Sequence, residues 1–359
     1  MKFTAGLFTV ILLVIGGVIA WRFLPDEGIS QKGAVAGETV SNVIAAATPT
    51  PNPMSIQAMR EKSYPGSQFS LIQTLPAGSN YTRQLVSYQS DGLKINGVLT
   101  IPTGLMPEGG FPAIVFNHGY IPPEVYRPTE RYIAYVDSFA RSGFVVFRPD
   151  YRGHADSEGE PEGAYFAPGY TVDVLNAFSS VQKVKEVNPK RVGLWGHSMG
   201  GFITQKAMVI NKDIKAGVIW GGVIGSYEDM YEYWWSKRSS PSSTPGLTAW
   251  TPSQREQATR RNSRQQFVQL YGEPKAGNAF WKEISAANFV NDFSGPVQIH
   301  HGLSDETVPY QLSERLALYL KEAGKTYELY TYPGGDHDIS DPNFSTAMNR
   351  SVEFFKKNL

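Results

Sequence analysis

The sequence predicts an α/β fold with a mostly parallel central sheet flanked by helices, on three observations. From about Ser55 onward, apolar runs bounded by Gly and Pro alternate with longer amphipathic segments, a pattern typical of α/β domains. Most of these runs are continuously apolar, as strands buried on both faces require. The 359 residues are 41% hydrophobic, which is enough to build one large core.

The predicted elements follow in chain order. RQLVSYQ and KINGVLTI flank Asp91-Gly92, a dipeptide that favours a tight hairpin turn. Six further strands are predicted at 112–117, 143–149, 191–196, 215–221, 296–302 and 326–333. Helices are predicted at 130–141, 171–186, 200–210, 310–323 and 344–357. Two antiparallel strands followed by βα units are therefore expected.

A segment rich in large aromatic residues interrupts this alternation between residues 226 and 287. Because it separates two predicted strands, we interpret it as a helical cap inserted over the sheet edge. Most of its aromatic side chains are expected to pack against the domain, with Trp234 or Trp235 as candidates to line a pocket.

The first 54 residues differ from the rest of the chain. Residues 3–21 carry no charge and are long enough to span a bilayer as a helix, so 1–24 is predicted to be a transmembrane anchor, with a cleaved signal peptide as the alternative. Residues 25–54 are small and polar and are predicted to be a disordered tether. The domain at 55–359 is then expected outside the cytoplasm, membrane-anchored or, after signal cleavage, secreted.

Charge and composition exclude several function classes. The 33 basic residues balance 33 acidic ones, so no net charge favours nucleic acid. The chain has no cysteine, which excludes thiol nucleophiles, disulfides and cysteine zinc sites. His154 lies near acidic residues, but the ligand spacing of a zinc site is missing, and no metal site is expected.

Ser198 is the candidate nucleophile, because GHSMG lies directly after a predicted strand and before a predicted helix. Ligands of open parallel sheets bind outside the carboxyl ends of the strands, and a serine on such a sharp turn presents its hydroxyl there. Residues two positions away must lack a β-carbon for the turn to close. Gly196 and Gly200 occupy both positions.

A serine hydroxyl needs a base, and the base needs an orienting carboxylate. His337 is the candidate base, since it lies in the glycine-rich loop after the last predicted strand. His197 is rejected because successive residues of the turn point in different directions. Asp305, in the loop after the preceding strand, is the candidate acid, with Glu306 as the alternative. The chain order Ser, Asp, His is a known order for this arrangement.

An oxyanion formed at the acyl carbon needs two N–H donors. The backbone N–H of Met199, directly after the nucleophile, is the first candidate. The second is Tyr120 in the loop after strand 112–117, through its N–H or its hydroxyl, where Gly119 permits close approach of the backbone.

These segments resemble the α/β-hydrolase superfamily and, more narrowly, the catalytic domain of the prolyl oligopeptidase family of serine peptidases. The resemblance covers about residues 82–359 and rests on NHGY (117–120), RPDYRGHADS (148–157), GHSMGG (196–201), HHGLSDETVP (300–309) and YPGGDHDI (332–339). It implies an α/β-hydrolase fold with Ser198 as nucleophile, Asp305 as acid and His337 as base, and Met199 and Tyr120 in the oxyanion hole.

The sequence also departs from that family. Its large members carry a β-propeller before the hydrolase domain, whereas only residues 1–81 precede the matching part here, so no propeller gate is expected. Smaller relatives include acyl-peptide hydrolases and feruloyl or acetyl esterases. We therefore expect a serine hydrolase that acts on a small-molecule peptide or ester substrate without a cofactor and is most like a peptidase. A carboxylesterase and a non-catalytic tethered binding protein are the alternatives.

Overall fold

The computed structural model describes residues 52–236 and 263–359. The predicted anchor, nearly all of the predicted tether and the middle of the predicted cap lie outside these residues. Within the two described ranges, no helix combines the length and the apolar character needed to cross a membrane.

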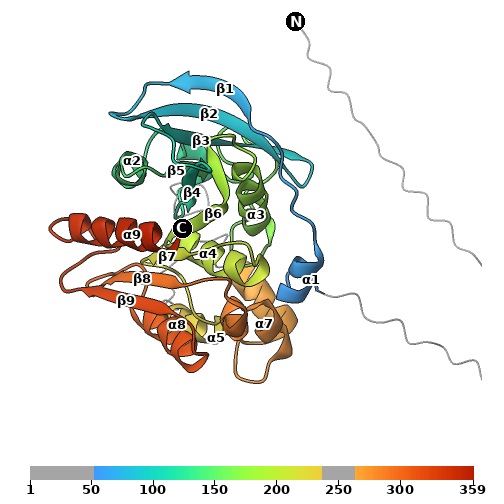
Figure 1. Ribbon diagram of the computed structural model, residues 1–359. Helices are drawn as coiled ribbons and strands as arrows, with labels where there is room; N and C mark the ends of the chain where they lie inside the picture. Colours follow the sequence, from blue (N-terminus) through green and yellow to red (C-terminus); the bar gives the residue numbers. More distant parts are fainter. Residues whose placement is uncertain (1–51, 237–262) are drawn as a thin grey trace, which may run out of the picture. The chain divides into compact units, whose positions relative to one another are not determined.

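Nine strands of the described residues form one mixed sheet, in the order β1-β2-β3-β5-β4-β6-β7-β8-β9 (Figure 1). The strands are β1 (Ser70–Leu75), β2 (Tyr81–Ser90), β3 (Leu93–Pro102), β4 (Phe111–Asn117), β5 (Val145–Pro149), β6 (Val187–His197), β7 (Gly217–Trp220), β8 (Val297–Gly302) and β9 (Tyr327–Tyr332). From β1 to β5 the neighbours are antiparallel, and from β5 to β9 they are parallel. The predicted mostly parallel sheet is confirmed.

The hairpin of β2 and β3 turns at the predicted dipeptide. Asp91 and Gly92 have φ angles of 56° and 82°, the left-handed pair that a two-residue hairpin turn requires. Strand β1 was missing from the prediction. Its consecutive residues Leu71 and Ile72 are both exposed at the sheet edge, so the strand has no alternation of buried and exposed positions for a sequence pattern to reveal.

The parallel strands supply side chains to two hydrophobic cores, one on each face of the sheet. On β4, Ala113 and Val115 belong to one core, and Ile114 and Phe116 belong to the other. Every residue of β4 is buried, which explains why the sequence of this strand is continuously apolar.

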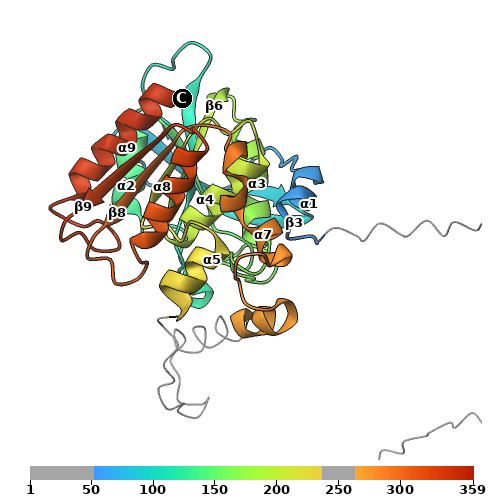
Figure 2. The same ribbon diagram turned by 90° about the horizontal axis from the view of Figure 1, so that it is seen from below.

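The helices cover both faces of this sheet. Among the described residues they include α1 (Ile56–Glu61), α2 (Ile133–Arg141), α3 (Gly169–Val181), α4 (Met199–Ile210), α5 (Tyr227–Asp229), α7 (Ala279–Ile284), α8 (Gln311–Glu322) and α9 (Phe344–Asn358), with the short 3₁₀ helices η1 (Pro123–Val125) and η5 (Ala286–Asp292) and the π-helix η2 (Met230–Trp235). Residues 263–271 are also helical. Helices α2 and α9 pack on one face and α3, α4 and α8 on the other (Figures 1 and 2).

The largest boundary error lies between α3 and β6. Helix α3 ends at Val181 rather than at the predicted 186, and β6 begins at Val187 rather than at 191. Val187 pairs with Phe111 at the start of β4, and this tertiary pairing extends the strand beyond its apolar part.

The described parts of the predicted cap, residues 226–236 and 263–287, are largely helical. Its aromatic side chains pack as expected: the ring centroids of Tyr227 and Trp281 are 5.1 Å apart, and both side chains are fully buried.

Candidate active site

Ser198 lies on a strained turn between β6 and α4. Its φ and ψ angles are 55° and −119°, a backbone conformation that costs a residue with a side chain about 1–3 kcal/mol. A β-carbon at Gly196 would lie 2.3 Å from the Gly200 carbonyl oxygen, and one at Gly200 would lie 1.9 Å from the Asn117 carbonyl oxygen. Both positions therefore require glycine, as the sequence predicted.

The structure brings Asp305 and His337 into direct contact. They follow the neighbouring strands β8 and β9, and Nδ1 of His337 lies 2.7 Å from Oδ2 of Asp305. This contact depends on Gly221, which follows β7 with a φ of 50°. A β-carbon there would lie 2.9 Å from the His337 carbonyl oxygen. Sequence reasoning missed Gly221, because its role depends on loops far along the chain.

The Asp305 carboxylate is held by several donors. Oδ1 accepts hydrogen bonds from the backbone N–H groups of Thr307 and Val308, at 2.8 and 2.9 Å. Burial opposes its negative charge, but the hydrogen bonds from His301 and His337 outweigh burial and hold the pKa of Asp305 well below its ordinary value. Glu306, the alternative acid, is exposed, and it is Asp305 that contacts His337.

His301 is a second imidazole on the acid, and sequence reasoning missed it. Its Nε2 lies 3.3 Å from Oδ2 of Asp305 and 3.0 Å from the Val308 carbonyl oxygen. Its Nδ1 accepts a 2.7 Å hydrogen bond from the Ser313 hydroxyl. These bonds are consistent with the tautomer whose proton is on Nε2. This Nε2–H group points at the acid loop, residues 303–310, which carries Asp305. The sequence offered one signal for this role, because His301 lies at the end of the predicted strand 296–302, where residues of the site are expected.

The two predicted oxyanion donors lie at the ends of neighbouring strands. Met199 is the first residue of α4, and the N–H groups of a first helical turn have no partner within the helix. The segment containing Gly119 and Tyr120 follows β4, which pairs with β6. A β-carbon at Gly119 would lie 3.1 Å from the β-carbon of Ser198, so the backbone of this loop packs directly on Ser198.

The segment RPDYRGHADS folds into a buried polar turn. Arg152 forms an ion pair with Asp173 at 2.9 Å. Asp150 accepts a 2.6 Å hydrogen bond from the Tyr126 hydroxyl. Across the described residues, no three His, Asp or Glu side chains are arranged to hold a metal ion.

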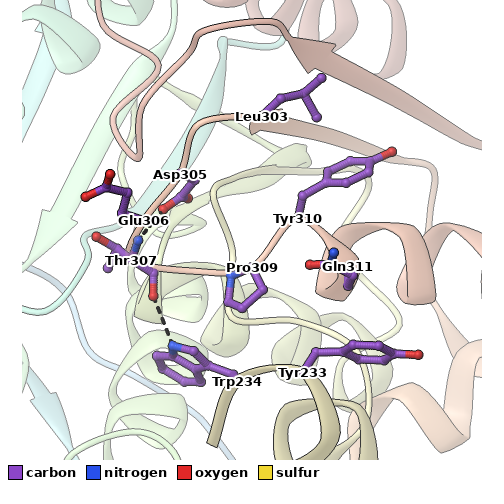
Figure 3. Close-up of a pocket in the computed structure, with 9 residues that line it drawn as sticks. All are labelled: Tyr233, Trp234, Leu303, Asp305, Glu306, Thr307, Pro309, Tyr310 and Gln311. Atoms are coloured by element: carbon purple, nitrogen blue, oxygen red, sulfur yellow. Dashed lines mark hydrogen bonds between the residues drawn. The ribbon is translucent and has the colours of Figure 1, made fainter. Parts of the chain in front are cut away.

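A pocket of about 340 Å³ opens beside the acid loop (Figure 3). Its lining residues are Tyr233, Trp234, Leu303, Asp305, Glu306, Thr307, Pro309, Tyr310 and Gln311. Trp234 donates its indole N–H to the Thr307 carbonyl oxygen at 2.9 Å and so ties the cap to the acid loop. Of the two tryptophans predicted for a pocket, Trp234 lines it, whereas Trp235 is buried in the core.

Comparison with known proteins identifies the family of the chain. The sequence profile of the family described as serine aminopeptidase, S33, matches residues 112–341. The chain belongs to this S33 family. The part matched to the S33 family begins in β4 and ends after the loop of His337, so it contains Ser198 and Asp305 as well.

Relatives of this S33 family member carry names from more than one hydrolase class. The chain is 27% identical over 289 residues to the uncharacterized peptidase YtmA of Bacillus subtilis, covering 79% of this chain and 96% of YtmA. The solved acetyl xylan esterase from Paenibacillus sp. R4 superposes with a TM-score of 0.59 at 19% identity, over 83% of this chain and 92% of that one. Dipeptidyl peptidase 4 of Porphyromonas gingivalis gives a TM-score of 0.58 at 19% identity, over 78% of this chain but only 36% of the peptidase.

The S33 family match and these fold similarities confirm the α/β-hydrolase fold and establish a serine hydrolase, either a peptidase or an esterase. The narrower resemblance to the prolyl oligopeptidase family stays a prediction.

Proposed function

We propose that the chain hydrolyses peptide bonds through a triad of Ser198, Asp305 and His337, in the manner of prolyl oligopeptidase-type catalytic domains. The observation that carries the proposal is the 2.7 Å hydrogen bond between His337 and Asp305, in a chain whose Ser198 occupies a strained strand-to-helix turn. A base oriented by a buried carboxylate beside a projecting serine is the arrangement that acyl transfer needs.

In this mechanism, Oγ of Ser198 attacks the acyl carbon while Nε2 of His337 removes its proton. The Nδ1–H of His337 stays hydrogen-bonded to Asp305, whose charge stabilises the imidazolium. The backbone N–H groups of Met199 and Tyr120 stabilise the oxyanion. His337 then protonates the leaving amine, the acyl-enzyme forms, and a water molecule activated by His337 releases the acyl group and restores Ser198.

A peptide substrate is supported by the S33 family and by the likeness to YtmA over nearly its full length. An ester substrate is the second candidate, because the chain also covers 92% of an acetyl xylan esterase without a large unmatched part. In that case the leaving group protonated by His337 is an alcohol, and the remaining steps are unchanged.

Labelling with a fluorophosphonate tests the nucleophile. The wild-type protein should be labelled and Ser198→Ala should not. Ser138→Ala, which removes a serine hydroxyl on α2 that donates to the Ala134 carbonyl oxygen, should be labelled normally. Ser198→Ala should lose turnover by about 10³-fold or more. A folded wild-type protein that resists labelling would contradict the proposal.

A panel of chromogenic acyl esters and of aminoacyl and peptidyl anilides separates the two substrate classes. The peptidase proposal requires anilide turnover that Ser198→Ala abolishes. Turnover of the esters alone would replace it with the carboxylesterase alternative.

We also propose membrane attachment through residues 1–24, with the hydrolase domain outside the cytoplasm. The support is the uncharged run at 3–21, which lies outside the described residues. N-terminal sequencing of the mature protein, together with protease accessibility in intact cells, distinguishes an anchor from a cleaved signal peptide.

A further inference from the structure

A continuous chain of hydrogen bonds connects three loops around Ser198. The backbone N–H of Gly119 donates to the Tyr132 hydroxyl at 2.9 Å. The same hydroxyl lies 2.8 Å from Nδ1 of His197. Nε2 of His197 lies 3.0 Å from the backbone carbonyl oxygen of His337. The chain thus runs from the loop after β4, past the nucleophile turn, to the loop after β9.

The hydrogen-bonding capacity of these groups fixes its direction. Because the N–H group of Gly119 can only donate, the single hydroxyl proton of Tyr132 goes to Nδ1 of His197. The proton of His197 then resides on Nε2 and points at the His337 carbonyl oxygen, which can only accept. Each group uses its proton once, and hydrogen bonds in such a chain strengthen one another.

The charge state of His197 agrees with this arrangement. Burial and, to a smaller extent, the neighbouring His337 lower the pKa of His197 to about 3, against the opposing effects of the hydrogen bond to the His337 carbonyl group and the charge of Asp305. The carboxylate of Asp338 lies 3.6 Å from Nε2, and this side chain is largely exposed. A neutral imidazole with both ring nitrogens engaged cannot serve as the base for Ser198, and its function must be sought elsewhere.

Packing holds the two side chains in place. The Tyr132 ring lies 5.5 Å from the Phe116 ring and 5.6 Å from the His197 ring, between centroids. Tyr132 itself has a left-handed backbone, with a φ of 57°, and directly precedes α2. The hydroxyl therefore meets Gly119 and His197 with little freedom to move.

We propose that Tyr132 and His197 are positioning residues. They fix the positions of two loops around Ser198: the loop after β4, which contains Gly119 and Tyr120, and the loop after β9, which contains His337. The proposal rests on the triad stated under the proposed function. Neither residue needs to touch substrate: Tyr132 acts through the backbone of Gly119, which packs on Ser198, and His197 acts through the backbone of His337.

Loss of this positioning should therefore lower kcat without changing KM. Displacement of a catalytic group by a fraction of an ångström reduces the rate of the chemical step by about 10–100-fold. In the proposed role, the Tyr132 hydroxyl contacts Gly119 and His197 rather than substrate. Tyr132→Phe, which keeps the ring and removes only the hydroxyl, should therefore lower kcat by about 10–100-fold and leave KM unchanged.

The test measures kcat per active site, after titration of competent Ser198 with the fluorophosphonate, so that misfolded protein does not count. Tyr88→Phe is the matched control, since it removes another buried tyrosine hydroxyl. That hydroxyl donates to the Asp173 carbonyl oxygen, with a hydrogen-bond length of 2.8 Å, and Asp173 belongs to α3 rather than to a loop of the proposed triad. Its kcat per site should equal that of the wild-type protein even where its Tm falls. His197→Gln should give the same loss as Tyr132→Phe, and the double variant should lose little more than either single variant.

A kcat within twofold of wild type in Tyr132→Phe overturns the inference. If that variant fails to fold, His197→Gln decides by the same criterion. Failure of the proposed function is a separate outcome, since the wild-type protein would then resist labelling altogether.

Discussion

At the scale of residues, the positions of Ser198, Asp305 and His337 were accessible to sequence reasoning because each follows a recognisable strand. The residues that support this proposed triad were not. Tyr132 lies 65 positions from His197 along the chain, and Gly221 and His301 act through contacts that form only when neighbouring strand ends assemble. A sequence pattern reports local geometry, whereas these roles arise from tertiary packing.

The second imidazole on Asp305 has a measurable effect of its own. His301→Gln should lower kcat per titrated site by about tenfold, because a hydrogen bond to a charged group contributes about 1.5 kcal/mol. It should also raise the pKa of Asp305, since the hydrogen bond from His301 helps to lower it.

The control for His301→Gln is a substitution of His300, the preceding residue of β8. His300 is equally buried but bonds to Tyr332 and Gln298. His300→Gln should destabilise the protein and leave kcat per site unchanged. An equal loss of kcat in both variants would show that His301 contributes only general stability.

At the scale of elements, helix α4 is buried along its whole length, including two long polar side chains. Gln205 is satisfied by both backbone groups of Gly225. Lys206 contacts the Met54 carbonyl oxygen at 3.5 Å and lies 5.9 Å from the centroid of the Phe202 ring. Burial nevertheless lowers the pKa of its ammonium group to about 8, so these contacts offset only part of the cost of burying the charge.

Lys206→Met should stabilise the protein by about 2 kcal/mol at pH 7. Since the folded-state pKa of Lys206 lies below its unfolded value, the cost is complete below pH 8 and disappears as the pH rises toward 10.5. Urea denaturation at pH 7 and pH 10 measures both effects. Lys321→Met, at an exposed position on α8, should change the free energy of unfolding by less than about 0.5 kcal/mol.

The elements also show where sequence reasoning stops. Strands buried on both faces were found from their apolar runs, and the helices from their amphipathic pattern. The edge strand β1 was missed because burial, which creates the pattern, is absent there. The boundary of β6 was missed because pairing with β4 determines it.

At the scale of the whole molecule, buried histidines link stability to pH. Burial lowers the pKa of His118, His154, His197 and His300. The unfolded chain therefore binds more protons than the folded protein below pH 6.5. The free energy of unfolding must decrease as the pH falls through this range.

Asp150 opposes this trend in part. Burial raises its pKa to about 6, so the folded protein binds one proton that the unfolded chain does not. With about 1.4 kcal/mol per proton and pH unit, the free energy of unfolding should fall by about 3 kcal/mol between pH 6.5 and 5.5. Chemical denaturation across this range measures the slope, and a flat profile would contradict the burial of neutral histidines.

The conformation of Ser198 has one more consequence. The residue is held between the last residue of a central strand and the first residue of a buried helix, and not in a flexible loop. Its backbone entropy is therefore lost when the chain folds, together with that of the sheet. No ordering of the Ser198 backbone remains to oppose substrate binding, so in the proposed triad this serine is preorganised for attack.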